Sequence, residues 1–186
     1  MRALLDANVL YPATLRSLLI DLSVMGVYQA HWTDEIHDEW IRNLLLNRPD
    51  LDRGNLQRTR ELMDRALDTA RITGYEALIP TLQLPDPDDR HVVAAALQGE
   101  VELIVTQNLK DFPEAGLKPL GLTAVHPDRF VGDLLKAQPE EVLAALRRGR
   151  ARYRAPALSA EEMLTMLERQ GLSTTSERLR ASTAQF

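Results

Sequence analysis

The sequence predicts an α/β fold in which helices cover both faces of a parallel sheet of about five strands. The first observation is a short apolar run at positions 3–5, which no helix precedes and which is typical of a buried strand. The second is the alternation of such runs with amphipathic segments, a pattern typical of parallel sheets. The third is a change at Pro127, after which every segment is helical in pattern. We therefore expect an α/β domain at residues 1–126 and a helical C-terminal extension at residues 127–186.

The composition describes an ordinary globular chain. Its 186 residues can bury a full core, and 45% of them are hydrophobic. The chain has no cysteine, which excludes disulfides and thiolate metal sites and is compatible with a reducing compartment. We found neither a signal peptide nor a run of about 18 apolar residues that would span a membrane. These features predict a soluble, cytoplasmic protein with no membrane partner.

The net charge of −5 is at first unfavourable to a nucleic-acid partner, because phosphate binding requires Lys and Arg. The charge is unevenly distributed, however. Residues 1–126 contain 12 Lys and Arg against 19 Asp and Glu, a balance of −7, whereas residues 127–186 contain 10 against 8, a balance of +2. The acidic residues are therefore concentrated in the part that we expect to contain the site.

The first half of the α/β domain contains two predicted strands and three amphipathic segments. After the N-terminal strand, a helix is expected from Pro12 to about Gly26, followed by a strand at residues 27–32. Thr33 caps the next helix, in which acidic residues occupy the first turn. A further amphipathic helix is expected at residues 56–72.

The second half contains three more predicted strands. Residues 77–82 are a weak candidate for a strand, since Pro80 cannot donate a ladder hydrogen bond. A helix rich in small residues follows a turn loaded with carboxylates and ends at Gly99. The β-branched run at residues 101–106 is a stronger strand candidate, and residues 122–125 complete a sheet of about five strands.

The extension is predicted to contain three helices, at residues 128–136, 139–153 and 159–170. Ser159 and Glu162 form a capping box at the start of the last one. The tail from Leu172 to Phe186 is rich in Ser and Thr, and we expect it to be partly disordered.

Four acidic residues follow predicted strands or begin the next helix: Asp6, Glu39, Asp89 and Asp111. Because the carboxyl ends of parallel strands lie on one edge of a sheet, we expect these carboxylates to converge. Each residue also has an ordinary interpretation on its own, as a helix cap, a solvated helix residue or a loop residue. At least one of Asp86, Asp88 and Asp89 is expected to serve only as a turn or cap residue. The shared placement is what favours a site.

Converging carboxylates cannot all remain ionised without a cation. An oxygen-only ligand set, with no His or Cys cluster, favours Mg²⁺ or Mn²⁺ over Zn²⁺. Such a cation polarises a phosphoryl oxygen and activates water, which predicts phosphodiester hydrolysis. Thr106 and Asn108 are placed to hydrogen-bond the carboxylates or their waters.

Four stretches resemble the PIN-domain ribonucleases of the VapC toxin type: LLDANVL, TDEIHDEWIRNL, DPDDRHVVAAAL and IVTQNLKDF. The resemblance covers residues 3 to about 125. It implies a three-layer α/β/α sandwich, an endonuclease that uses Mg²⁺ or Mn²⁺ to hydrolyse RNA, and a small antitoxin as partner in a toxin–antitoxin system.

The same resemblance assigns roles to residues. It implies that Asp6, Glu39, Asp89 and Asp111 are the catalytic, metal-binding acids, with Asn8, Thr106 and Asn108 as supporting polar residues. Asp89 is preferred to Asp88 because the acid of the family precedes a small helical residue by seven positions, which here is Ala96. Asn108 stands where many members have an aspartate.

The extension contains a run of arginines next to Tyr153, which indicates either a solvated helix face or a contact with RNA phosphates or an acidic antitoxin segment. The candidate RNA contacts are Arg147, Arg148, Arg150, Arg152 and Arg154. The four histidines show no ligand spacing and are interpreted as surface or packing residues, and Trp32 and Trp40 as core residues.

Two other functions are compatible with part of the pattern. A phosphatase of the haloacid dehalogenase type also begins with an aspartate after its first strand, but requires a second aspartate where this chain has Asn8. A catalytically degenerate domain that binds RNA or a partner is the other alternative, and the presence of all four acids is unfavourable to it. The RNA, the number of metals, the antitoxin and the existence of a homodimer stay open.

Overall fold

The computed structural model describes all 186 residues and contains one parallel sheet of four strands. β1 (Arg2–Leu5) lies in the centre, between β2 (Gln29–His31) and β3 (Leu103–Val105), and β4 (Thr123–Val125) forms the edge beyond β3. Leu5 of β1 is paired with Val105 of β3, so the two strands end side by side. The apolar residues of β1 are fully buried, as the sequence predicts.

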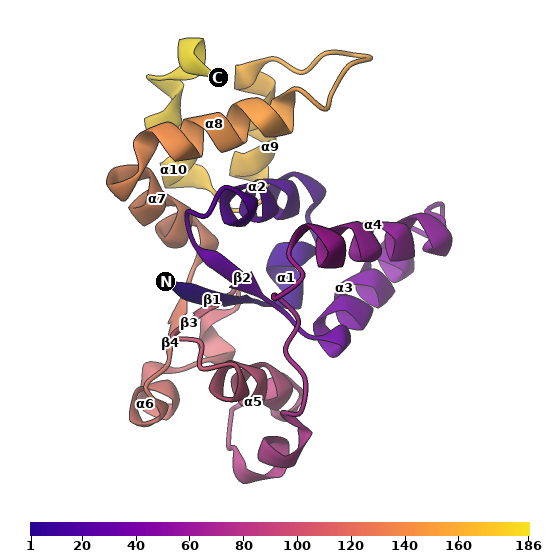
Figure 1. The fold of residues 1–186 in the computed structure, drawn as a ribbon, viewed down its shortest axis with the longest axis vertical. Helices are drawn as coiled ribbons and strands as arrows, with labels where there is room; N and C mark the ends of the chain where they lie inside the picture. Colours follow the sequence, from indigo (N-terminus) through magenta and orange to yellow (C-terminus); the bar gives the residue numbers. More distant parts are fainter.

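Helices cover both faces of the sheet. The domain contains α1 (Ala7–Leu10), α2 (Ala13–Val24), α3 (Asp34–Asn47), α4 (Arg53–Ala66), α5 (Arg90–Gln98) and α6 (Glu114–Leu117). In Figure 1, α2 lies on one side of the sheet and α5 and α6 lie on the other. The three-layer α/β/α arrangement is therefore confirmed. Trp32 and Trp40 are completely buried, which confirms them as core residues.

The predicted strand at residues 77–82 is wrong, which is why the sheet has four strands and not five. Residues Glu76–Thr81 form a 3₁₀-helix, η1, with Pro80 inside it. Proline lacks the donor that a strand requires. The chain instead pairs with the end of β2 a few residues earlier, where Trp32 N donates to Ala70 O at 3.1 Å and Ile72 N donates to Trp32 O at 2.8 Å.

The helix predicted at residues 56–72 has the wrong bounds. The observed α4 begins at Arg53, because the Asp52 carboxylate accepts a hydrogen bond from Asn55 N at 2.9 Å and caps it, and ends at Ala66. Leu62 is 55% exposed on this helix, whereas Met63 is buried. Three further 3₁₀-helices connect the other elements: η2 (Pro87–Asp89), η3 (Leu109–Asp111) and η4 (Lys118–Leu120).

The extension is helical, as predicted, with α7 (Pro127–Ala137), α8 (Pro139–Arg150) and α9 (Ala160–Arg169). The capping box between Ser159 and Glu162 is present. The expected disorder of the tail is wrong, because α10 (Ser173–Arg180) and η5 (Thr183–Gln185) occupy it. Asp128 of α7 caps α10 by accepting hydrogen bonds from Thr174 N at 2.9 Å and Thr175 N at 2.8 Å.

Ion pairs to one buried carboxylate, Asp21, attach the extension to the domain. Asp21 of α2 is 1% exposed, and Arg152 donates hydrogen bonds to both of its carboxylate oxygens, at 2.6 Å to Oδ2. Arg148 Nε lies 3.1 Å from Asp21 Oδ1. Two of the five arginines proposed as RNA contacts therefore have a structural partner, and α8 packs along α2 as a result. A third, Arg150, donates to Leu158 O at 3.3 Å.

Figure 1 shows the extension gathered on the α2 side of the sheet, so that it forms a further helical layer over the domain. None of the helices combines the length and the apolar character that a membrane span requires.

Candidate active site

Asp6 is held rigidly where β1 ends. It caps α1, and its Oδ1 accepts a hydrogen bond from Ala7 N at 2.6 Å. Its Oδ2 accepts hydrogen bonds from the Thr106 hydroxyl, at 2.6 Å, and from the Asn8 side-chain amide. Thr106 follows β3, so the parallel pairing of β1 with β3 brings these residues together. The carboxylate consequently has one defined orientation at the carboxyl edge of the sheet.

The supporting polar residues form one connected network. The Thr106 hydroxyl oxygen accepts hydrogen bonds from Asn8 Nδ2 at 2.9 Å and from Asn108 N at 3.0 Å. The Asn108 side-chain amide in turn donates to Asp111. Asn8 therefore serves as a donor to Asp6 and is not a second acid, which is unfavourable to the phosphatase alternative.

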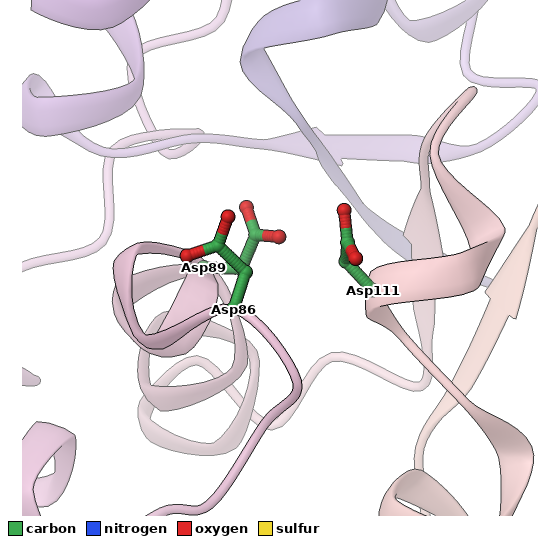
Figure 2. Close-up of side chains that lie close together, drawn as sticks. All are labelled: Asp86, Asp89 and Asp111. Atoms are coloured by element: carbon green, nitrogen blue, oxygen red, sulfur yellow. The ribbon is translucent and has the colours of Figure 1, made fainter.

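Three carboxylates converge beside this network. Asp86, Asp89 and Asp111 each offer one oxygen, and these oxygens all lie within 4.8 Å of one another. Figure 2 shows Asp86 and Asp89 side by side, with Asp111 facing them from a separate segment. The 3₁₀-turn η2 brings Asp86 and Asp89 together, and the Asp86 carboxylate caps that turn by accepting from Asp88 N at 2.9 Å. Asp88 itself is exposed and lies outside the group.

Of the four acids that the sequence singles out, the structure places Asp89 and Asp111 in this group of three. Asp6 and Glu39 are not members of this group, although their negative charges help to raise the pKa of Asp89. Asp86, which the sequence leaves open as a turn residue, is the additional member. The sequence feature that could have identified Asp86 is its position three residues before Asp89, because one tight turn brings two side chains at this spacing together.

The electrostatics of the group are unfavourable to full ionisation. Burial raises the pKa of Asp89 to about 7, and the charges of Asp6, Asp86, Asp111 and Glu39 act in the same direction. Burial likewise raises the pKa of Asp6 to about 6, against the opposing effect of the hydrogen bond from Thr106. Of the three clustered acids only Asp111 has an ion-pair partner, Lys110 at 3.9 Å. Oxygen donors this close, with so little positive charge nearby, fit a divalent cation.

His91 belongs to the site, which the sequence does not reveal. It is 6% exposed, and its Nε2 lies 3.7 Å from Oε2 of Glu39 while its Nδ1 lies 3.6 Å from Oε2 of Glu35. Although burial lowers the pKa of His91, the hydrogen bond and charges of these glutamates outweigh burial and raise it overall. The interpretation as a surface or packing residue therefore misses its contacts. Ligand spacing among the four histidines does not reveal these contacts, because they depend on the position of His91 in the first turn of α5.

The buried Asp6 carboxyl predicts a pH-dependent stability in the absence of metal. Its pKa of about 6 in the folded protein exceeds the ordinary value of 3.8, so the folded state binds this proton more tightly than the unfolded state does. The resulting stability is fully present below about pH 4 and is lost as the pH rises through about 6. A shift of this size corresponds to at most about 3 kcal/mol.

We expect urea unfolding in EDTA to show this loss in the wild type and not in Asp6→Asn, which cannot titrate at this position. The free energy of unfolding of the variant, relative to wild type, should rise between about pH 4 and pH 6.5. A difference that stays constant over this range would contradict the assignment.

Comparisons with known proteins agree with this architecture. A family model described as "PIN domain" matches residues 2–110, and a model described as "VapC50 C-terminal domain" matches residues 127–181. The curated protein "Putative ribonuclease VapC50" of Mycobacterium tuberculosis (strain ATCC 25618 / H37Rv) is 44% identical over 80 residues, which are 43% of this chain and 47% of that protein. The matched region is thus about half of the relative's length. No solved structure matches the chain.

The PIN-domain match covers more than half of the chain, from the start of β1 to the segment that carries Asn108. It therefore includes β1, β2 and β3, and of the acids discussed above only Asp111 lies beyond it. The chain belongs to the PIN domain family.

Proposed function

We propose that this protein is a metal-dependent endoribonuclease, which hydrolyses phosphodiester bonds of RNA and acts as the toxin of a toxin–antitoxin pair. The observation that carries the proposal is the group of three carboxylates beside Asp6, at the carboxyl edge of a PIN-domain sheet. The similarity to a protein named as a ribonuclease supports the same reaction.

Mg²⁺ or Mn²⁺ is the proposed cofactor, because the donors are all carboxylate oxygens. Asp89 and Asp111 would hold it, with Asp6 and Glu39 as the further acids of the site and Asp86 as an added candidate from the structure. When bound, such a cation polarises a phosphoryl oxygen of the substrate and makes water a stronger nucleophile at neutral pH.

The protein residues around this site supply orientation. Thr106 and Asn8 fix the Asp6 carboxylate, and Asn108 fixes Asp111. His91 contacts Glu39, which is otherwise 31% exposed on α3, and so restricts its rotamers. Because these contacts exist before substrate arrives, the acids need little rearrangement in the reaction.

The other parts of the proposal concern the cellular context. We propose a cognate antitoxin as protein partner, a cytoplasmic location and a domain boundary at residues 126/127, where β4 gives way to α7. A homodimer is left open. The five arginines of the extension remain proposed RNA contacts, and Arg148 and Arg152 also bind Asp21.

Removing the metal tests the reaction. We expect the purified protein to cleave a mixed-sequence RNA pool in Mg²⁺ or Mn²⁺ and to lose that activity in excess EDTA, because the carboxylates alone repel a phosphate. Readdition of Mn²⁺ should restore cleavage. Cleavage that continues in EDTA, or an absence of cleavage with either metal while RNA is still bound, would contradict the proposed function and favour a binding module.

A further inference from the structure

An open groove leads away from the acid site toward the C-terminal extension. It has a volume of about 1060 Å³ and begins at Asn8 and Glu39. Pockets that hold whole small molecules measure about 300 to 1000 Å³, so this groove can accommodate a short stretch of chain. Its far side is formed by Arg169, Gln170 and Gly171, at the turn between α9 and α10.

One wall of the groove is a polar stripe on α3. Glu39, Asn43 and Asn47 are spaced four residues apart and therefore lie on the same helix face, about 6 Å from one to the next. Asn43 and Asn47 continue the line of Glu39 away from the acids. The carboxamides of asparagine can hydrogen-bond the exposed edges of unpaired bases.

The extension is anchored at the groove by specific contacts. Gln107, which directly follows Thr106 in the site, donates a hydrogen bond from Nε2 to Gln170 O at 3.1 Å. Gln170 Oε1 accepts from Leu15 N of α2 at 2.7 Å. Gly171 has a positive φ of 101°, and a side chain there would meet Gln107 Nε2 at 3.5 Å. The α9–α10 turn is therefore a fixed wall of the groove, placed beside the acids.

Arg169 is the cation that this wall presents. It is exposed and forms no ion pair, whereas Arg48, which also lines the groove, is paired with Asp50 at 2.6 Å. A cation in the last turn of a helix also interacts favourably with the helix dipole, so the charge of Arg169 by itself does not indicate a ligand. Its location in a groove that shares Asn8 and Glu39 with the candidate site is the second observation. In a protein of net charge −5, an unpaired arginine at that position is suited to a backbone phosphate.

We infer that this groove binds a single-stranded segment of the RNA substrate and that Arg169 of the extension contacts one of its backbone phosphates. The inference rests on the proposed function and adds to it a role for the extension, namely to complete the substrate site of the domain. Single-stranded RNA is favoured over a duplex because the base edges that the Asn43 amide can hydrogen-bond are exposed in unpaired bases. Tyr11, which also lines the groove, offers a ring for stacking.

Binding of a fluorescein-labelled, mixed-sequence single-stranded RNA tests the inference. The measurement uses Asp6→Asn protein in Mg²⁺ so that the RNA stays intact. Adding Arg169→Glu should weaken binding about tenfold at 0.1 M salt and lower the salt slope by about 1, as expected for the loss of one phosphate contact. Asn43→Leu, which is close to asparagine in size and adds no charge, should weaken binding as well and leave the slope unchanged.

Arg58→Glu is the matched control, because Arg58 is exposed and unpaired on α4 and lies outside the groove. It should change the affinity by less than about twofold. Equal losses for Arg58→Glu and Arg169→Glu would show general charge attraction and overturn the inference. An unchanged affinity for Arg169→Glu would also overturn it and would direct attention to a protein segment as occupant.

The two proposals fail in distinguishable ways. If the wild type cleaves RNA with metal but Arg169→Glu does not alter binding, the groove inference fails and the function stands. If RNA binding depends on Arg169 but no metal supports cleavage, the proposed nuclease activity is wrong and the proposed RNA binding in the groove is supported.

Discussion

Asp6→Asn is expected to lower metal-dependent RNA cleavage by more than about 100-fold, which exceeds the usual effect of removing a partner of a metal ligand. The substitution removes the negative charge from a carboxylate that is held by Thr106 and Asn8 and whose charge acts on Asp89. It also places an amide donor where Asn8 and Thr106 donate. The acids would then hold a cation less firmly and in an altered orientation.

Asp88→Asn provides the control, since the same chemical change is made on an exposed aspartate of the neighbouring turn. Initial cleavage rates of a labelled RNA in Mn²⁺ should be near wild type for Asp88→Asn and barely measurable for Asp6→Asn. Far-ultraviolet circular dichroism checks that both variants are folded. Equal rates for the two variants would remove Asp6 from the catalytic machinery.

Asp21→Ala is expected to destabilise the protein by about 1.5 to 3 kcal/mol, because it removes charge-assisted hydrogen bonds to a buried carboxylate, while the half-exposed arginines left behind stay hydrated. Asp21 is 1% exposed and is the carboxylate to which Arg148 and Arg152 both bind. The loss would therefore loosen α8 from α2, and with it the attachment of the extension to the domain.

The free energy of unfolding, measured in urea at pH 7, gives the magnitude. Asp68→Ala serves as comparison because Asp68 is exposed and forms no ion pair, and it should lie within about 0.5 kcal/mol of wild type. A loss below about 1 kcal/mol for Asp21→Ala would mean that the arginines find other partners and that the ion pair does not hold the extension.

The sequence predicts the sheet best where burial alone determines structure. β1 and β3 are apolar on both faces, as parallel strands require, and both were found where expected. The segment at residues 77–82 has a similar apolar content, but Pro80 and local turn hydrogen bonds favour a 3₁₀-helix. The helix of the C-terminal tail was missed because its cap, Asp128, lies 46 residues away from Thr174 in the sequence.

The candidate site, like the fold, was predictable only where local sequence determines the position of a residue. Asp6 and Asp111 were predictable as site candidates because each follows a strand of a parallel sheet, and such strands end on one edge. Asp86 could be recognised only from its spacing to Asp89, and the contact of His91 with Glu39 of α3 had no signal in the sequence. In the arginine run, the sequence could not show that a buried acid from α2 engages Arg148 and Arg152, because Asp21 is more than 120 residues away in the chain.

The most direct test of the proposed metal-dependent mechanism is Mn²⁺ binding by the metal-free protein, measured by isothermal titration calorimetry at pH 7.5 for wild type and Asp89→Asn. Burial and the neighbouring acids raise the pKa of Asp89 to about 7, so Mn²⁺ should relieve repulsion there. We predict saturable binding by wild type and a loss of at least about tenfold in affinity for the variant. Equal affinities, or no binding by wild type, would contradict the proposed metal site.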